Sequence, residues 1–110
     1  MEFQNHVVLI TGGDTGIGKE TARSFLAHGA NIVINGRRQE ILAATARELD
    51  ATGQRIAIVP GDISQLETAQ RIVDLACDRF GGVNISINNA GIFKPTTFLE
   101  YGVTSGRQAA

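Results

Sequence analysis

Eight residues near the start of the chain, Thr11 to Gly18, have the composition of an anion-binding loop. They read Thr-Gly-Gly-Asp-Thr-Gly-Ile-Gly and follow a β-branched run, residues 7–10, that is typical of a strand buried on both faces. A helical pattern comes next, with Ala22, Phe25 and Leu26 at i, i+3 and i+4. Free amides and the positive end of a helix dipole would then face an anion. The sequence therefore predicts a phosphate-binding loop between a strand and a helix.

The glycines of this loop have separate predicted roles. Gly12 allows the tight exit from the strand, Gly16 lets the backbone approach a phosphate, and Gly18 permits close packing of the helix on the strand. The same cluster could also be a glycine-rich turn that binds nothing. A strand before it, a helix after it and a second strand further on favour a dinucleotide-binding loop.

The remaining pattern alternates strands with helices, which is typical of a parallel sheet with right-handed crossovers. The helix after the loop should stop at Gly29, a second should run from about Gln39 to Gly53, and a third should stop at Gly81. We predict strands over residues 7–10, 31–35, 55–60 and 83–88. The predicted fold is α/β, a Rossmann-type doubly wound sheet of about four strands in the order 3-2-1-4, with three helices.

The third helix carries a predicted N-terminal signal. Ser64 and Glu67 have the spacing of a capping box, in which the serine caps the amide of Glu67 and the carboxylate reaches back. One apolar face of this helix should be formed by Leu66, Ala69, Val73, Ala76 and Phe80. We expect residues 1–93 to form the dinucleotide-binding domain and residues 94–110 to be an irregular tail.

Composition excludes several other classes of protein. The chain has 110 residues, 43% hydrophobic and 19% charged, with a formal net charge of −1, which fits a globular domain. No basic patch suggests a nucleic-acid or membrane partner. Cys77 is the only cysteine, and His6 and His28 have no further ligands at metal spacing, so we predict no metal site. The first residues do not resemble a signal peptide, which favours a cytoplasmic location.

Three motifs resemble the short-chain dehydrogenase/reductase family. The loop matches that family's Thr-Gly-x-x-x-Gly-x-Gly, Gly61-Asp62-Ile63 matches its acidic-aliphatic pair after the third strand, and residues 88–91 match its Asn-Asn-Ala-Gly. The motifs occur in the family's order and on the expected elements. We place the resemblance at about residues 5–100, ending before Tyr101.

The resemblance implies which residues hold a nicotinamide dinucleotide. Asp62 would accept a hydrogen bond from the adenine amino group beside Ile63, while Asn88 and Asn89 would brace the sheet and line the ribose. The implied cofactor-binding residues are Gly12, Asp14, Thr15, Gly16, Ile17, Gly18, Arg37, Arg38, Asp62, Ile63, Asn89, Ala90 and Gly91.

The residues after the second strand favour NADP over NAD. An NAD-preferring site places an acid there, about 20 residues past the loop, on the ribose 2′-hydroxyl. This chain instead has Asn35, Gly36, Arg37 and Arg38, with no carboxylate before Glu40. Arginine can bind a 2′-phosphate bidentately, and we expect Arg37 first and Arg38 second in this role. The alternative is that both arginines only solvate a helix start, where the dipole disfavours cations.

We predict no catalytic residue within these 110 residues. The family's chemistry, carbonyl reduction or alcohol oxidation, needs a serine and a Tyr-x-x-x-Lys pair on a later helix. The single tyrosine, Tyr101, is followed four places on by Ser105, and no lysine comes after Lys94. The chain then corresponds to the cofactor-binding part of a parent enzyme, which would be homo-oligomeric and would take a small carbonyl or alcohol substrate.

Two other functions remain open at this point. The chain could be a non-catalytic NADP-binding or interaction module, because the catalytic half is missing. A methyltransferase of related fold also uses a glycine loop, but such sites usually have an acid after the second strand, where Arg37 stands. The fourth strand, which should be central in a full sheet, would be an exposed edge prone to aggregation or partner capture.

Overall fold

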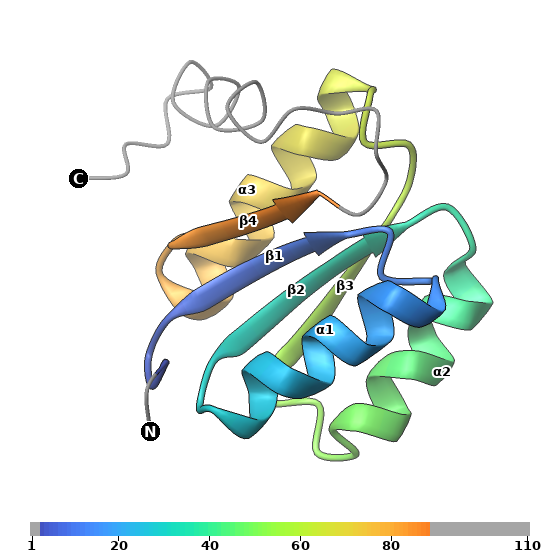
Figure 1. Cartoon of the computed structure of the whole chain (residues 1–110). Helices are drawn as coiled ribbons and strands as arrows, with labels where there is room; N and C mark the ends of the chain where they lie inside the picture. The colour runs from blue at the N-terminus through green and yellow to red at the C-terminus, as the bar shows by residue number, and fades with distance from the viewer. Residues whose placement is uncertain (1–2, 89–110) are drawn as a thin grey trace.

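Four parallel strands form one sheet in the order β3-β2-β1-β4 (Figure 1). The computed structural model describes residues 3–88. The strands are β1 (Val7–Thr11), β2 (Asn31–Gly36), β3 (Ile56–Pro60) and β4 (Ile85–Asn88). The helices are α1 (Gly16–Ala27), α2 (Gln39–Leu49) and α3 (Leu66–Phe80). The predicted α/β class and the predicted strand order are both confirmed.

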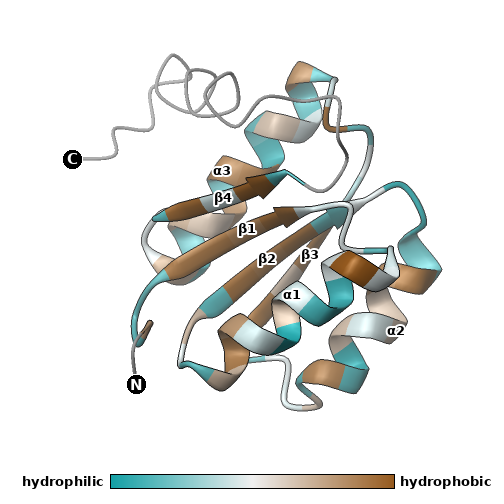
Figure 2. Cartoon of the chain, viewed as in Figure 1, coloured by the Kyte–Doolittle hydropathy of each residue, from teal (hydrophilic) through white to brown (hydrophobic). Residues whose placement is uncertain are grey.

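The helices cover both faces of the sheet, with α1 and α2 on one face and α3 on the other (Figure 1). Alternate residues of β1 serve the two layers, because successive side chains of a strand point to opposite faces. Val8 and Ile10 pack with Ala22 and Leu26 of α1, whereas Val7 and Leu9 belong to the cluster that includes α3. The strands are accordingly apolar along most of their length (Figure 2).

The predicted element boundaries differ from the observed ones by a few residues. β4 begins at Ile85 rather than at residue 83, and α2 ends at Leu49 rather than near Gly53. Gly81 ends α3 in the left-handed region, with φ of 87°, as predicted for a helix stop. The tail predicted for residues 94–110 lies outside the described residues.

The predicted capping box at the start of α3 is wrong. Because Gln65 is the N-cap, Glu67 lies one residue too early to complete the box. The Ser64 hydroxyl instead donates to Oδ1 of Asp62 at 2.7 Å. Leu66 was also placed wrongly on the apolar face: as the first residue of α3 it is 57% exposed, and Ile72 is fully buried in the core instead.

One buried polar residue ties the ends of three strands together. The side chain of Asn35, near the end of β2, is 1% exposed, and its amide donates to the carbonyls of Val59 at 2.8 Å and Gly61 at 3.1 Å. The backbone carbonyl of Asn35 accepts from the amide of Gly13 at 2.8 Å. The loops after β1 and β3 are therefore both anchored to β2. Buried polar groups with satisfied bonds of this kind hold one arrangement of a chain.

We expect Asn35→Ala to lower the free energy of unfolding by about 1–3 kcal/mol, because it leaves buried carbonyls without a donor. Chemical denaturation followed by circular dichroism measures the change. Asn31→Ala, on the same strand, is the control, since the Asn31 side chain makes no hydrogen bond within the described residues and should cost about 0.5 kcal/mol or less. Equal losses in the two variants would show that the bonds of Asn35 do not carry this stability.

Candidate nucleotide-binding site

The carboxyl ends of β1, β2 and β3 meet at one edge of the sheet, where a cavity of about 450 Å³ opens. In open parallel sheets, ligands bind outside the carboxyl ends of the strands. The cavity is lined by Gly12, Asp14, Thr15, Asn35, Gly36, Arg37, Arg38, Gly61, Asp62 and Ile63. The structure therefore brings together predicted residues from three separate loops.

The loop before α1 leaves two backbone amides available at the helix start. Thr15 is the N-cap, and its hydroxyl accepts from the amide of Gly18 at 3.0 Å while it donates to the carbonyl of Gly12 at 2.7 Å. The amide of Lys19 bonds the Thr15 carbonyl. Within residues 3–88 no acceptor serves the amides of Gly16 and Ile17, which are the groups a helix offers to an anion.

The geometry of the loop requires glycine at two of the three predicted positions. Gly12 has a φ of 71°, which favours glycine, and it makes the turn out of β1. A Cβ at Gly18 would lie 2.2 Å from the carbonyl oxygen of Gly12, so the helix and the loop touch there. A Cβ at Gly16 would meet nothing within 4 Å among the described residues. Gly16 is thus free of internal constraints and faces open space.

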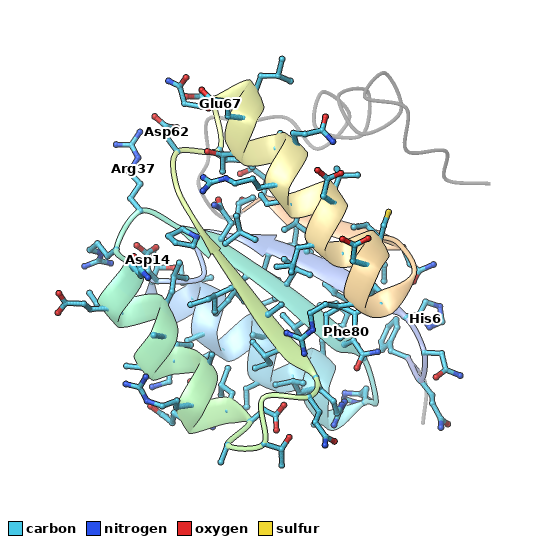
Figure 3. All side chains as sticks on the ribbon, turned by 180° about the vertical axis from the view of Figure 1, so that it is seen from behind. His6, Asp14, Arg37, Asp62, Glu67 and Phe80 are labelled. Carbon is cyan, nitrogen blue, oxygen red and sulfur yellow. The ribbon has the colours of Figure 1, made fainter. Side chains whose placement is uncertain are left out.

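Arg37 and Asp62 face each other across the mouth of the cavity. The Arg37 guanidinium donates from Nη2 to Oδ2 of Asp62 at 2.9 Å, and the two labelled side chains lie next to each other in Figure 3. The side chains are 69% and 31% exposed. Exposed pairs of this kind contribute about 0–1 kcal/mol, so Arg37 can change its partner at little cost.

Hydrogen bonds keep the carboxylate of Asp62 ionised. The Ser64 hydroxyl and the Ser64 amide both donate to Oδ1, at 2.7 Å and 2.9 Å. These bonds, with a smaller contribution from the charge of Arg37, hold the pKa of Asp62 below its usual value. Asp62 is therefore an acceptor at neutral pH, as an adenine amino group would require.

Arg38 is bound more firmly, to Asp14. Its backbone amide and Nε reach Oδ2 of Asp14 at 3.2 Å and 3.1 Å, and its Nη2 reaches the Asp14 carbonyl at 2.7 Å. The Asp14 side chain is only 9% exposed. It packs against Gly36, where an added Cβ would lie 2.6 Å from Cγ of Asp14.

The predicted residues are not all in this cavity. Ile63 lines it and is 5% exposed, whereas Ile17 is 74% exposed and, with Gly16, borders a separate hollow along α1. Asn89, Ala90 and Gly91 lie outside the described residues. At the end of β4, the hydroxyl of Thr11 donates to Oδ1 of Asn88 at 3.0 Å, which joins β1 to β4 in the bracing manner expected of Asn88.

Sequence reasoning missed three residues that line the cavity: Asn35, Gly36 and Gly61. The signal for Asn35 was available, because a polar residue closes an otherwise buried apolar strand. Gly61 has a φ of 141° and so favours glycine. Gly36 carries no such backbone signal, since its need for glycine comes from the side chain of Asp14.

Comparison with known proteins identifies the family. A family model described as short chain dehydrogenase matches residues 6–108. The chain belongs to the short-chain dehydrogenase/reductase family. The match continues beyond Tyr101, so the prediction that the resemblance ends before that residue is wrong.

Individual members of the family are similar over the same region. An L-rhamnose-1-dehydrogenase from Scheffersomyces stipitis is 43% identical over 98 residues, which are 86% of this chain and 38% of that protein. A glucose/ribitol dehydrogenase from Brucella melitensis has a TM-score of 0.77 and 38% identity, over 86% of this chain and 39% of that one. L-sorbose reductase from Gluconobacter frateurii, complexed with NADPH and L-sorbose, has a TM-score of 0.74 and 33% identity, over 86% and 37%. The chain therefore spans less than two fifths of the length of each of these relatives.

Among residues 3–88 no group of three histidine, cysteine or acidic side chains could hold a metal ion. No helix in that part of the chain is long and apolar enough to cross a bilayer.

The cavity fits the dinucleotide that members of the family bind. Gly16 leaves room for a ligand at the helix start beside the cavity, and the amides of Gly16 and Ile17 suit a pyrophosphate. Asp62 supplies an ionised acceptor and Arg37 a cation at the cavity mouth.

We expect Gly18→Ala to lower the free energy of unfolding by about 1–3 kcal/mol, because its Cβ would collide with backbone. Gly16→Ala should leave stability unchanged or slightly improved, since alanine is the better helix former. Isothermal titration with ADP should nevertheless show weaker binding to the Gly16→Ala variant. Unchanged ADP affinity in that variant would argue against a phosphate at Gly16.

Removal of the Ser64 hydroxyl should raise the pKa of Asp62 toward the ordinary value of an aspartate, because the hydrogen bond that lowers it most is lost. Carbon-detected NMR titration of the side-chain carboxyl measures this in the Ser64→Ala variant. Asp50, whose pKa is lowered chiefly by Thr52, is the internal control and should not move.

The same variant has a defined pH dependence of stability. The pKa of Asp62 is lower in the folded state than in the unfolded state, where an aspartate has a pKa of about 3.9. Its contribution to the free energy of unfolding is therefore fully present above that pH and is lost as the pH falls through the folded-state pKa. Ser64→Ala should therefore be less stable than the unsubstituted chain at pH 7, and the difference should shrink at low pH. A difference independent of pH would contradict this role for the hydroxyl.

Proposed function

We propose that this chain binds NADP(H) for an oxidoreductase that reduces a carbonyl or oxidises an alcohol. The observation that carries the proposal is Arg37, a 69% exposed cation at the mouth of a cavity whose neighbouring strand, β2, ends without an acid. An acid at that place would repel a 2′-phosphate, whereas a guanidinium can bind one.

The charges around the cavity support a phosphate ligand. Asp14 is engaged by Arg38 and Asp62 by Arg37, so both acids that line the cavity are paired. Arg37 uses one of its five N–H donors on Asp62, which leaves donors for a second anion. Arg37 is therefore the residue we assign to the 2′-phosphate.

Similar proteins support the same cofactor. The L-sorbose reductase is complexed with NADPH, and an L-rhamnose 1-dehydrogenase from Sphingomonas, 38% identical over 99 residues, is named for NAD(P)(+). Other relatives are named for steroids and for an acyl-CoA thioester. Because these substrates have little in common, the proposal extends to the reaction class and to no particular substrate.

The residues of this chain would hold and orient the cofactor. The amides of Gly16 and Ile17 would bind the pyrophosphate, Asp62 and Ile63 the adenine, and Asn89, Ala90 and Gly91 would complete the site. When bound, the nicotinamide supplies or accepts a hydride. No Tyr-x-x-x-Lys occurs in the 110 residues, so we propose that they bind the cofactor without turnover, within a cytoplasmic and homo-oligomeric parent.

We expect the chain to bind NADPH more tightly than NADH, and Arg37→Ala to weaken NADPH about 10- to 100-fold with little change for NADH. The magnitude is that of a charge-assisted hydrogen bond, about 1.5–3 kcal/mol. Titration of the nicotinamide fluorescence measures both affinities.

Arg47→Ala is the matched control for this experiment. Arg47 is an exposed arginine in the last turn of α2 and makes no hydrogen bond within the described residues. Arg47→Ala changes the net charge by the same amount as Arg37→Ala. It should alter NADPH affinity about twofold or less. Equal affinity for NADPH and NADH in the unsubstituted chain would overturn the proposal, and so would an equal effect of Arg37→Ala and Arg47→Ala.

A further inference from the structure

We propose that Asp14 and Arg38 act as one positioning unit for 2′-phosphate recognition, in which Arg38 neutralises Asp14 rather than binding the phosphate. The inference rests on the proposed function, because it concerns how the cavity accepts a 2′-phosphorylated dinucleotide. It differs from the prediction made from sequence, in which Arg38 is a second phosphate ligand.

The contacts of Arg38 are directed at Asp14. Both the carboxylate and the backbone carbonyl of Asp14 accept from Arg38, at 3.1 Å from Nε and 2.7 Å from Nη2. The backbone amide of Arg38 adds a third bond, at 3.2 Å to Oδ2. Arg38 is itself 58% exposed and keeps further N–H donors, but moving its guanidinium away from a carboxylate that is 9% exposed would break two bonds and is costly. The pair of Arg37 with Asp62, with its single bond and exposed partners, is the easier one to open.

Asp14 also fixes the backbone on both sides of Arg37. It accepts the amide of Arg38 on one side and packs against Gly36 on the other, where a Cβ would lie 2.6 Å from its Cγ. The carbonyl of Gly36 is held in turn by the amide of Gly61 at 2.9 Å. Arg37 therefore projects from a turn whose two neighbouring residues are both tied down.

This arrangement places a carboxylate in the lining of a cavity that is to receive an anion. Without a partner, Asp14 would repel a 2′-phosphate bound in the cavity, because like charges interact strongly where water is partly excluded. The guanidinium of Arg38 cancels that charge, while the acceptor atoms of Asp14 keep the turn in place. The negative charge of Asp14 thus opposes phosphate binding, whereas its acceptor atoms and its volume favour binding by holding the turn that carries Arg37.

Substitution by asparagine separates charge from shape. Asparagine at position 14 retains an oxygen that accepts the amide of residue 38 and has nearly the same volume, but it carries no charge. The effect of removing Arg38 should therefore depend on which residue occupies position 14. A direct phosphate ligand would show no such dependence.

The test compares binding of 2′-phospho-ADP-ribose and ADP-ribose to the full chain by isothermal titration calorimetry. Arg38→Ala should weaken 2′-phospho-ADP-ribose about tenfold and ADP-ribose about twofold or less. Asp14→Asn alone should bind 2′-phospho-ADP-ribose as tightly as the unsubstituted chain or up to about tenfold more tightly. The double variant, Asp14→Asn with Arg38→Ala, should return to within about threefold of the unsubstituted chain.

Each alternative outcome is informative. If the double variant is as weak as Arg38→Ala, Arg38 binds the phosphate directly and the inference is wrong. If Arg38→Ala weakens both nucleotides equally, its role is structural and the inference is again wrong; thermal unfolding of each variant records that loss. If the unsubstituted chain prefers neither nucleotide, the proposed function fails and this inference with it. The chain could also prefer 2′-phospho-ADP-ribose over ADP-ribose and lose this preference in Arg37→Ala but not in Arg38→Ala. That result would sustain the proposed function and overturn only the inference.

Discussion

The candidate site depends on Asn35, through both its buried side chain and its backbone carbonyl. Parallel strands bring their carboxyl ends to one edge, but the loops that leave those ends would be free to separate. Asn35 prevents this, because its side-chain amide donates to carbonyls at the end of β3 and its backbone carbonyl accepts from the amide of Gly13 after β1. The floor of the cavity is thus part of the folded core, and a ligand would not need to order it. Preorganised sites of this kind lose less entropy on binding.

The rim of the cavity has the opposite character. Arg37 is exposed and shares a single hydrogen bond with the partly buried Asp62, whereas Asp14 is nearly buried and holds Arg38 through several. The two arginines are adjacent in sequence and chemically identical, but their acidic partners differ in burial and in the number of hydrogen bonds they make. Burial of the acidic partner, more than the identity of the arginine, makes the pair of Arg38 with Asp14 the harder one to separate.

Much of the fold could be predicted from the sequence, because it depends on periodicity. The apolar runs and the glycine stops give the order of strands and helices, and Gly81 ends α3 where the pattern places it. The partners of polar side chains could not be predicted in this way. Ser64 has the spacing of a cap, but its hydroxyl donates to Asp62, and the helix begins one residue later, with Gln65 as its N-cap. The pairing of Arg38 with Asp14 arises only when β1 and β2 lie side by side in their observed register.

The close packing of Asp14 against Gly36 has a consequence for how this branch of the family can diverge. An acid at position 36, at the end of β2, would find the space for its Cβ already taken by Asp14. The order of substitutions then matters, because position 14 has to become smaller before position 36 can become larger. The two neighbouring loops are therefore coupled by epistasis, because the residues that position 36 can accept depend on the residue at position 14.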